Sequence, residues 1–131
     1  MHPNQQLIHD FFDAFAGGDV EALQRIFADD ILMIEPGNTD CAGEYRGQAE
    51  VFAFFGRLGE RTNGSLKIER IHDILANDER AVAIFEVSGE RDGEPLGWTV
   101  NELYEIRDGR IQTIQAFVFD VAPLDKAYAP A

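Results

Sequence analysis

The stretch that decides the fold is Phe27-Ala-Asp-Asp-Ile-Leu-Met-Ile-Glu-Pro-Gly37. It begins as the last turn of an apolar-faced helix and passes through an acidic corner at Asp29-Asp30. The apolar, partly β-branched residues from Ile31 onward then predict a strand. That strand ends at Glu35, a carboxylate between apolar neighbours and a proline, which is costly to bury. Glu35 is therefore either an acid that lines a pocket or a solvated residue at the end of the strand.

Two helical segments precede this stretch. The first has apolar residues at the spacing of an amphipathic helix, namely Leu7, Ile8, Phe11, Phe12 and Phe15. Gly17-Gly18 ends it, because glycine accepts the left-handed conformation past a helix C-terminus. Asp19 is the expected N-cap of a second short helix. The expected buried side of that helix is Val20, Leu23, Ile26 and Phe27.

After Glu35, the residues from Pro36 through Glu44 predict an irregular loop. A helical period returns at Gln48 and predicts a third helix with a broad apolar face, formed by Val51, Phe52, Phe54, Phe55 and Leu58. The second half of the chain changes to four strand-like segments, over residues 66–75, 81–88, 96–106 and 111–121. The pairs between them are hairpin signals: Asn77-Asp78, Asp92-Gly93 and Asp108-Gly109.

Three helices followed by long antiparallel strands predict an α+β fold. The length of 131 residues, without a repeat or a linker, predicts a single domain over residues 1–131. Strands that curl around the third helix would leave an apolar cone, and ten Phe residues are consistent with such a nonpolar interior. The default hypothesis for this shape is a small-molecule pocket.

The composition excludes several other function classes. With 24 acidic and 11 basic residues, the net charge of −13 repels nucleic acid and offers no basic patch to anionic lipid. No apolar run is long enough to span a membrane, and the N-terminus lacks the pattern of a signal peptide, so we expect a cytoplasmic protein. Three His residues without a His or Cys pair at ligand spacing argue against a metal site. P-loop, GxGxxG and GxSxG motifs are absent from the sequence.

The chain resembles the SnoaL-like and ketosteroid isomerase-like branch of the nuclear transport factor 2 superfamily. The resemblance covers nearly the whole chain and rests on the order and spacing of short motifs: residues 16–20, 27–30, 35–36, 45–47, 91–93 and 107–111. It implies a cone-shaped curved antiparallel sheet packed against three N-terminal helices, an architecture also called cystatin-like. It further implies a deep pocket, no cofactor, and a homodimer formed through the outer face of the sheet.

The resemblance also implies roles for particular residues. Glu35-Pro36 matches the position of the aspartate that serves as general base in the steroid isomerases. Glu102 matches their neutral aspartic acid, which donates a hydrogen bond. Phe11 stands where these enzymes have a hydrogen-bonding tyrosine, and phenylalanine cannot donate. Asp120 matches the acid–base aspartate that ends the last strand in SnoaL-like cyclases.

Strand periodicity gives independent expectations for two of these acids. Alternation places Glu102 on the same side as the apolar residues of its strand, so it faces a cavity unless a bulge changes the parity or Arg70 pairs with it. By the same rule Asp120 would lie at the pocket rim, although a strand-ending aspartate also often caps the next turn. The opposite face would then expose Phe117 and Phe119, which suggests a dimer interface.

We expect the ligand-binding surface to consist of Phe11, Phe15, Phe55, His72, Trp98, Tyr104, Ala116 and Val118. His72 can line the cavity from a neighbouring strand or be a core histidine with satisfied hydrogen bonds. The favoured function is to bind a small, largely apolar molecule and move a proton on it, as an isomerase or cyclase without a cofactor. Glu35 would be the base, Glu102 a polarising acid and Asp120 a second acid–base candidate. The alternatives are a ligand-binding module without chemistry and a protein-binding adaptor.

Overall fold

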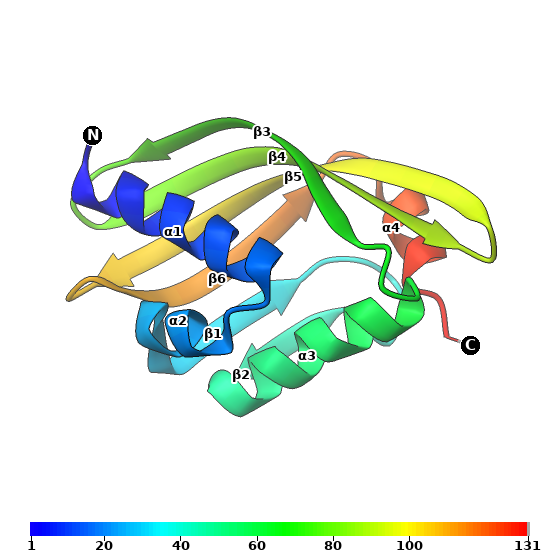
Figure 1. The fold of residues 1–131 in the computed structure, drawn as a ribbon, viewed down its shortest axis with the longest axis horizontal. Helices are drawn as coiled ribbons and strands as arrows, with labels where there is room; N and C mark the ends of the chain where they lie inside the picture. Colours follow the sequence, from blue (N-terminus) through cyan, green and yellow to red (C-terminus); the bar gives the residue numbers. More distant parts are fainter. Residues whose placement is uncertain (131) are drawn as a thin grey trace.

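The computed structural model of the protein describes residues 1–130. Within these residues a curved six-stranded sheet is packed against helices on one face (Figure 1). This arrangement confirms the predicted α+β class. The elements in chain order are α1 (Pro3–Gly17), α2 (Val20–Ile26), β1 (Phe27–Glu35), β2 (Gly43–Arg46), α3 (Gln48–Arg61), β3 (Lys67–Ala76), β4 (Arg80–Arg91), β5 (Glu94–Arg107), β6 (Arg110–Val118) and α4 (Val121–Ala127).

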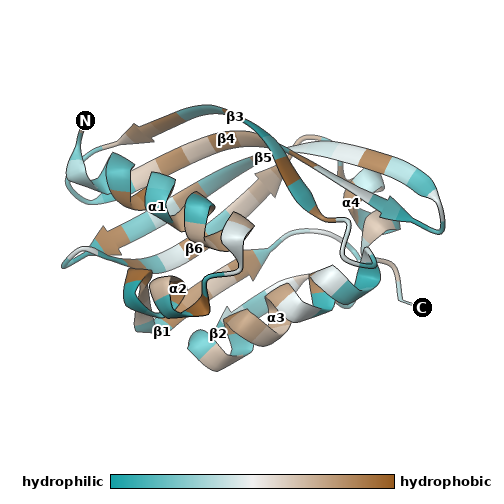
Figure 2. Cartoon of the chain, viewed as in Figure 1, coloured by the Kyte–Doolittle hydropathy of each residue, from teal (hydrophilic) through white to brown (hydrophobic). Residues whose placement is uncertain are grey.

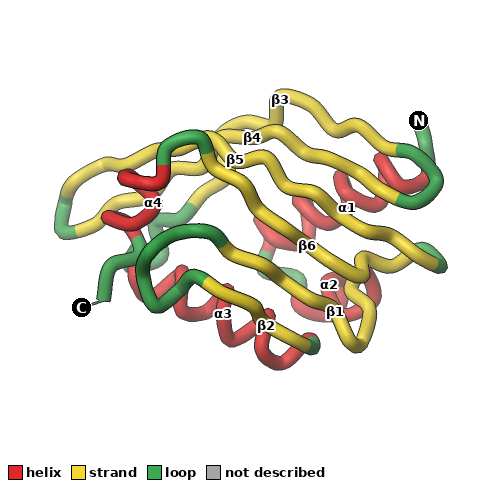
Figure 3. Tube along the Cα trace, turned by 180° about the vertical axis from the view of Figure 1, so that it is seen from behind, coloured by secondary structure: helices red, strands yellow, loops and turns green. Residues whose placement is uncertain are grey.

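The strand order in the sheet is β2-β1-β6-β5-β4-β3. Strands β3 to β6 form the predicted antiparallel meander, but β1 pairs with β6 in parallel, with Met33 beside Ile114. The predicted curved antiparallel sheet therefore contains one parallel pair, between β1 and β6. No hairpin joins β1 to β6, so local turn geometry does not constrain their relative direction. Figure 3 shows the sheet from behind, with β6 between β1 and β5.

The helix ends follow the predicted signals. Gly18 ends α1 with a left-handed φ of 64°, and the Asp19 carboxylate caps α2 by accepting a hydrogen bond from the backbone N–H of Ala22 at 3.1 Å. Two details differ from expectation at the ends of α2. Val20 is exposed in the first turn, and Phe27 is already the first residue of β1.

Two of the predicted hairpins are made by pairs of left-handed residues. Asp92 and Gly93 have φ values of 53° and 81°, and Asp108 and Gly109 have values of 54° and 71°. Positive φ at both central residues is the geometry of the tight turns that match the twist of paired strands. The first turn sets the register of β4 against β5, whereas the register of β5 against β6 shifts once, between Glu105 and Ile106.

Two short elements were not predicted. Strand β2 lies in part within the expected loop and pairs with β1, with Tyr45 beside Met33. The last strand ends at Val118 instead of continuing to residue 121, and α4 follows it. Figure 1 shows α4 near the end of α3, where the two elements close one end of the fold.

The core lies between the helices and the inner face of the sheet. Its largest fully buried side chains include Tyr104, Phe27 and Phe54. Hydrophobic and hydrophilic residues alternate along the strands and around the helices (Figure 2), as expected when one side of each element is buried. No helix within residues 1–130 is long and apolar enough to cross a membrane.

Candidate functional site

A cavity of about 70 Å³ lies between the inner face of the sheet and helices α1 and α3. Its wall is mostly apolar and rich in phenylalanine. Among the described residues, four lining side chains also carry a polar group: Glu35, Trp98, Glu102 and Tyr128. An apolar cavity with a few convergent polar groups is the usual form of a small-molecule site.

Glu35 is the last residue of β1 and is only 9% exposed. Within residues 1–130 its carboxyl group has neither a cation nor a hydrogen-bond donor as partner. The oxygens of this carboxyl group nevertheless keep some accessible surface, and the side chain lines the cavity. Burial, and after it the charge of Glu102, raise the pKa of Glu35 well above its ordinary value.

Glu102 lies on the inner face of β5, as strand alternation predicts. Tyr104, two residues further on the same face, donates a hydrogen bond from its hydroxyl to Oε1 of Glu102 at 2.5 Å. The ring of Tyr104 is fully buried and meets Phe11 edge to face at 5.9 Å between centroids. Burial raises the pKa of Glu102 to about 7, although the hydrogen bond from Tyr104 acts in the opposite direction.

The two carboxyl groups reach the cavity from strands on either side of β6. Ala116 on β6 pairs with Glu102, and on the other side Ile34 pairs with Gln115, which brings Glu35 next to Ala116. Two strand spacings separate the Cα atoms of the two acids by roughly 10 Å. Ala116, which lies between them on β6, also lines the cavity.

Seven of the eight residues predicted to bind ligand fall into two groups. Five line the cavity, namely Phe11, Phe15, Phe55, Trp98 and Ala116. Two others lie behind this wall. Tyr104 supports Glu102 by its hydrogen bond, and Val118 packs against the core. A binding role for any of these residues stays a prediction.

Both positions expected for His72, in the cavity wall or in the core, are wrong. His72 is exposed on β3, and its Nε2 lies 3.3 Å from Oε2 of Glu86 on the neighbouring strand. Strand β3 has two register irregularities, one between Ile68 and Arg70 and one between Ile71 and Asp73. Each of these shifts changes which residues point inward, so simple alternation fails along this edge strand.

The expectation that Asp120 lies at the pocket rim is also wrong. Asp120 is exposed and follows the end of β6, where strand alternation no longer applies. Its Oδ1 accepts a hydrogen bond from the backbone N–H of Ala122 at 3.1 Å and so caps α4. The alternative role for this aspartate, a cap of the following turn, is the one the structure supports.

The C-terminal segment closes part of the cavity, which was not predicted from the sequence. Leu124 of α4 and Tyr128 just after it both lie in the cavity wall. The available signal was Asp120 as an N-cap, followed by apolar residues at helical spacing at Val121, Leu124 and Tyr128. Pro123 in the first turn is compatible with such a helix.

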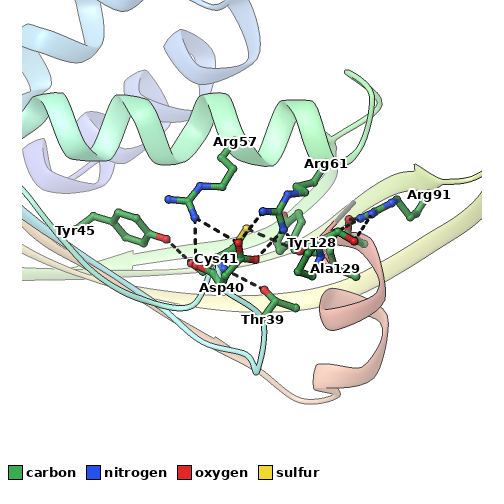
Figure 4. Close-up of polar contacts among 11 residues, drawn as sticks. Thr39, Asp40, Cys41, Tyr45, Arg57, Arg61, Arg91, Tyr128 and Ala129 are labelled. Atoms are coloured by element: carbon green, nitrogen blue, oxygen red, sulfur yellow. Dashed lines mark hydrogen bonds and ion pairs between the residues drawn. The ribbon is translucent and has the colours of Figure 1, made fainter.

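Two arginines hold this segment in place (Figure 4). Arg61 of α3 donates to the backbone oxygen of Tyr128 at 2.7 Å and to both carboxylate oxygens of Asp40 at 2.8 Å. Arg91 of β4 donates to the backbone oxygens at the end of the chain, those of Ala127, Ala129 and Pro130. On the other side of α4, the carboxylate of Asp125 accepts two hydrogen bonds from Asn38 at 2.8 Å each.

Comparisons with known proteins agree with this architecture. Residues 8–114 match the SnoaL-like domain family. A protein of Mycobacterium tuberculosis described only as uncharacterised is 30% identical over 124 residues, which is 94% of each chain. A Xanthomonas campestris protein of unknown function with a cystatin-like fold has a TM-score of 0.91 at 28% identity, covering 99% of this chain and 100% of that one. Bal32a, from a soil-derived mobile gene cassette, has a TM-score of 0.90 at 27% identity and 96% coverage of both chains. The chain therefore belongs to the SnoaL-like family of the nuclear transport factor 2-like superfamily.

Proposed function

We propose that the cavity binds a small, largely apolar molecule and that Glu35 moves a proton on it, as an isomerase or a cyclase. One observation carries this proposal. Glu35 is a buried carboxyl group beside a cavity, with no charge or hydrogen bond within residues 1–130 to stabilise its ionised form. A strongly perturbed acid in a pocket is a candidate for proton transfer, because a base works best when its pKa is near the working pH.

The two acids suit complementary roles. Ionised Glu35 would remove a proton from a carbon next to a carbonyl group, and the electrons of the C–H bond would move onto the carbonyl oxygen. Glu102, whose pKa is about 7, would donate a hydrogen bond to that oxygen in its protonated form. Protonated Glu35 would then return the proton at another carbon of the ligand, so the reaction needs no cofactor. Because the two charges repel each other, ionisation of only one acid at a time is favoured.

The proposal includes a homodimer in the cytoplasm. Phe117 on the outer face of the sheet is 48% exposed, and Phe119 just beyond β6 is 91% exposed. Large apolar side chains on an outer sheet face are typical of an interface. The surface of a second copy of the chain would shield them from water.

Titration of the carboxyl groups tests the proton-transfer proposal without any ligand. Carbon-13 NMR of the glutamate carboxyl groups should show a resonance that titrates far above the ordinary range, and Glu35→Gln should remove it. The matched control is Asp120→Asn, which changes an exposed acid outside the cavity and should leave that resonance in place. An ordinary pKa for Glu35 would eliminate it as the base.

The alternative functions predict different results. A binding module without chemistry predicts thermal stabilisation by planar apolar compounds that is unchanged in Glu35→Gln. A protein-binding adaptor predicts no stabilisation by such compounds, because its ligand would contact the outer face of the sheet instead of the cavity. The buried, unpaired acid favours the enzyme over both, since a purely apolar wall would serve binding at lower cost.

A further inference from the structure

We propose that the Tyr128 hydroxyl is a specificity-determining hydrogen-bond donor, which selects ligands that carry a carbonyl or similar oxygen. This inference rests on the proposed function to the extent that the cavity must bind a small molecule. It adds a polar group from the C-terminal segment to a cavity whose other polar side chains, Glu35, Trp98 and Glu102, all come from the sheet.

The backbone of Tyr128 is fixed on several sides (Figure 4). Its carbonyl oxygen accepts hydrogen bonds from Arg61 at 2.7 Å and from the buried thiol of Cys41 at 3.8 Å. Its N–H donates to the carbonyl oxygen of Leu124 at 3.0 Å. The aromatic ring meets Trp98 edge to face, with 5.5 Å between centroids and an interplanar angle of 84°. The position of the side chain is therefore set before any ligand arrives.

The hydroxyl, by contrast, has no partner within residues 1–130. Tyr128 is only 3% exposed and lines the cavity, yet its hydroxyl oxygen keeps some accessible surface. Buried tyrosine hydroxyls usually have a hydrogen-bond partner, because leaving one unpaired costs free energy. The cavity is the space from which such a partner can come.

The surroundings of this hydroxyl indicate what it recognises. Burial, and then the charges of Glu35, Cys41 and Glu102, raise the pKa of Tyr128 well above its ordinary value. The hydroxyl therefore remains a donor throughout the pH range in which Glu102 titrates. A ligand oxygen that accepts this hydrogen bond would lie in the same cavity as both acids, where proton transfer needs it.

Binding of two compounds that differ in one oxygen atom tests the inference. Dissociation constants for 1-indanone and for indane would be measured by protein NMR titration, on the wild type and on Tyr128→Phe. Comparing the ratio of the indane constant to the 1-indanone constant between the two proteins cancels the difference in hydrophobicity between the two compounds. We expect Tyr128→Phe to lower this ratio about tenfold, the effect of losing one hydrogen bond to a buried acceptor.

Tyr45→Phe is the matched control. The Tyr45 hydroxyl donates to the backbone oxygen of Cys41 at 2.6 Å and is not part of the cavity wall, so its removal should leave the ratio unchanged. The phenylalanine in Tyr128→Phe keeps the ring that packs on Trp98, so the fold should be retained, which circular dichroism can check.

An unchanged ratio in Tyr128→Phe would overturn the inference, and so would failure of 1-indanone to bind the wild type. The carboxyl titration uses no ligand, so it separates this failure from a failure of the proton-transfer proposal. A raised Glu35 pKa together with an unchanged ratio would leave Glu35 as the base and remove Tyr128 from the site.

Discussion

Asp40 and Glu35 lie five residues apart in the chain, yet the protein stabilises the charged form of Asp40 and disfavours the charged form of Glu35. Asp40 is exposed and receives two hydrogen bonds from Arg61, which lower the pKa of Asp40. Glu35 is buried and has no such partner within residues 1–130, and its pKa is raised. The acid that ties a loop to α3 is therefore kept ionised. The acid beside the cavity is left free to gain and lose a proton.

The largest effect is expected where the unpaired acid is removed. If Glu35 is the base, the protein should accelerate exchange of the C2 protons of 1-indanone in deuterated water, followed by proton NMR. Glu35→Gln should reduce this acceleration by roughly 10²–10⁴-fold, the usual contribution of a general base. The rate should rise with pH as the first of the two acids ionises and fall again once both are ionised, because the reaction needs one charge and one proton between Glu35 and Glu102.

Asp120→Asn serves as the control in the exchange experiment. Asparagine also caps helices, so α4 should be retained and the exchange rate should equal that of the wild type. Acceleration that persists in Glu35→Gln would show that the base is another group.

A smaller effect is expected on the pH dependence of stability. The pKa of Glu102 is raised from its ordinary value near 4.5 to about 7, so the folded state holds a proton that the unfolded state has lost. The unfolding free energy should therefore fall as the pH rises from about 4.5 to about 7, by roughly 3 kcal/mol from this residue. Urea unfolding of the wild type and Glu102→Gln at pH 5 and pH 8 measures the difference. Glu102→Gln should show a markedly smaller decrease, and an equal decrease would mean that Glu102 titrates normally.

A local effect is expected at the C-terminal segment. Arg91→Met removes three hydrogen bonds to backbone oxygens while keeping most of the aliphatic length of the side chain. We expect a loss of about 1–2 kcal/mol in the stability of this segment. Hydrogen exchange measured by mass spectrometry should show faster exchange in α4 than in the wild type, with β4 and β5 unchanged at their centres. Equal exchange in α4 would show that Arg91 does not hold the segment.

The smallest effect is expected at Asp40, where the sign is opposite to that at Glu102. A lowered pKa stabilises the folded state above the ordinary pKa of aspartate, and this contribution is lost as the pH falls through the lowered value. Asp40→Asn should therefore weaken the loss of stability in acid and leave the decrease between pH 5 and pH 8 as it is. Because the pair is exposed, added salt should reduce the difference between the two proteins.

Local patterns predicted most of the fold. The helical spacing in α1, the cap at Asp19 and the turn residues at Asp92-Gly93 all act over a few residues, so one sequence is enough to identify them. Alternation along β5 correctly placed Glu102 on the inner face, because the strand is regular on both sides of that residue.

The parts of the fold and of the site that were not predicted depend on contacts between segments that lie far apart in the sequence. The parallel pairing of β1 with β6 and the docking of α4 on the cavity leave little trace in local periodicity. The register shifts of β3 displaced His72 from its expected face, and the end of β6 at Val118 changed Asp120 from a wall residue into a cap. Tyr128 was missed because its contribution depends on Arg61 and Cys41, which lie far away in the sequence.

The size of the cavity has a kinetic consequence. A cavity of about 150 Å³ accommodates benzene, and the volume here is about 70 Å³. A ring-sized ligand therefore needs part of the wall to move before it can bind, and its apparent affinity is reduced by the fraction of molecules in the open form. The association rate should then level off at high ligand concentration, at the rate with which the wall opens. In Arg91→Met, where the C-terminal segment is held less firmly, that limiting rate should increase.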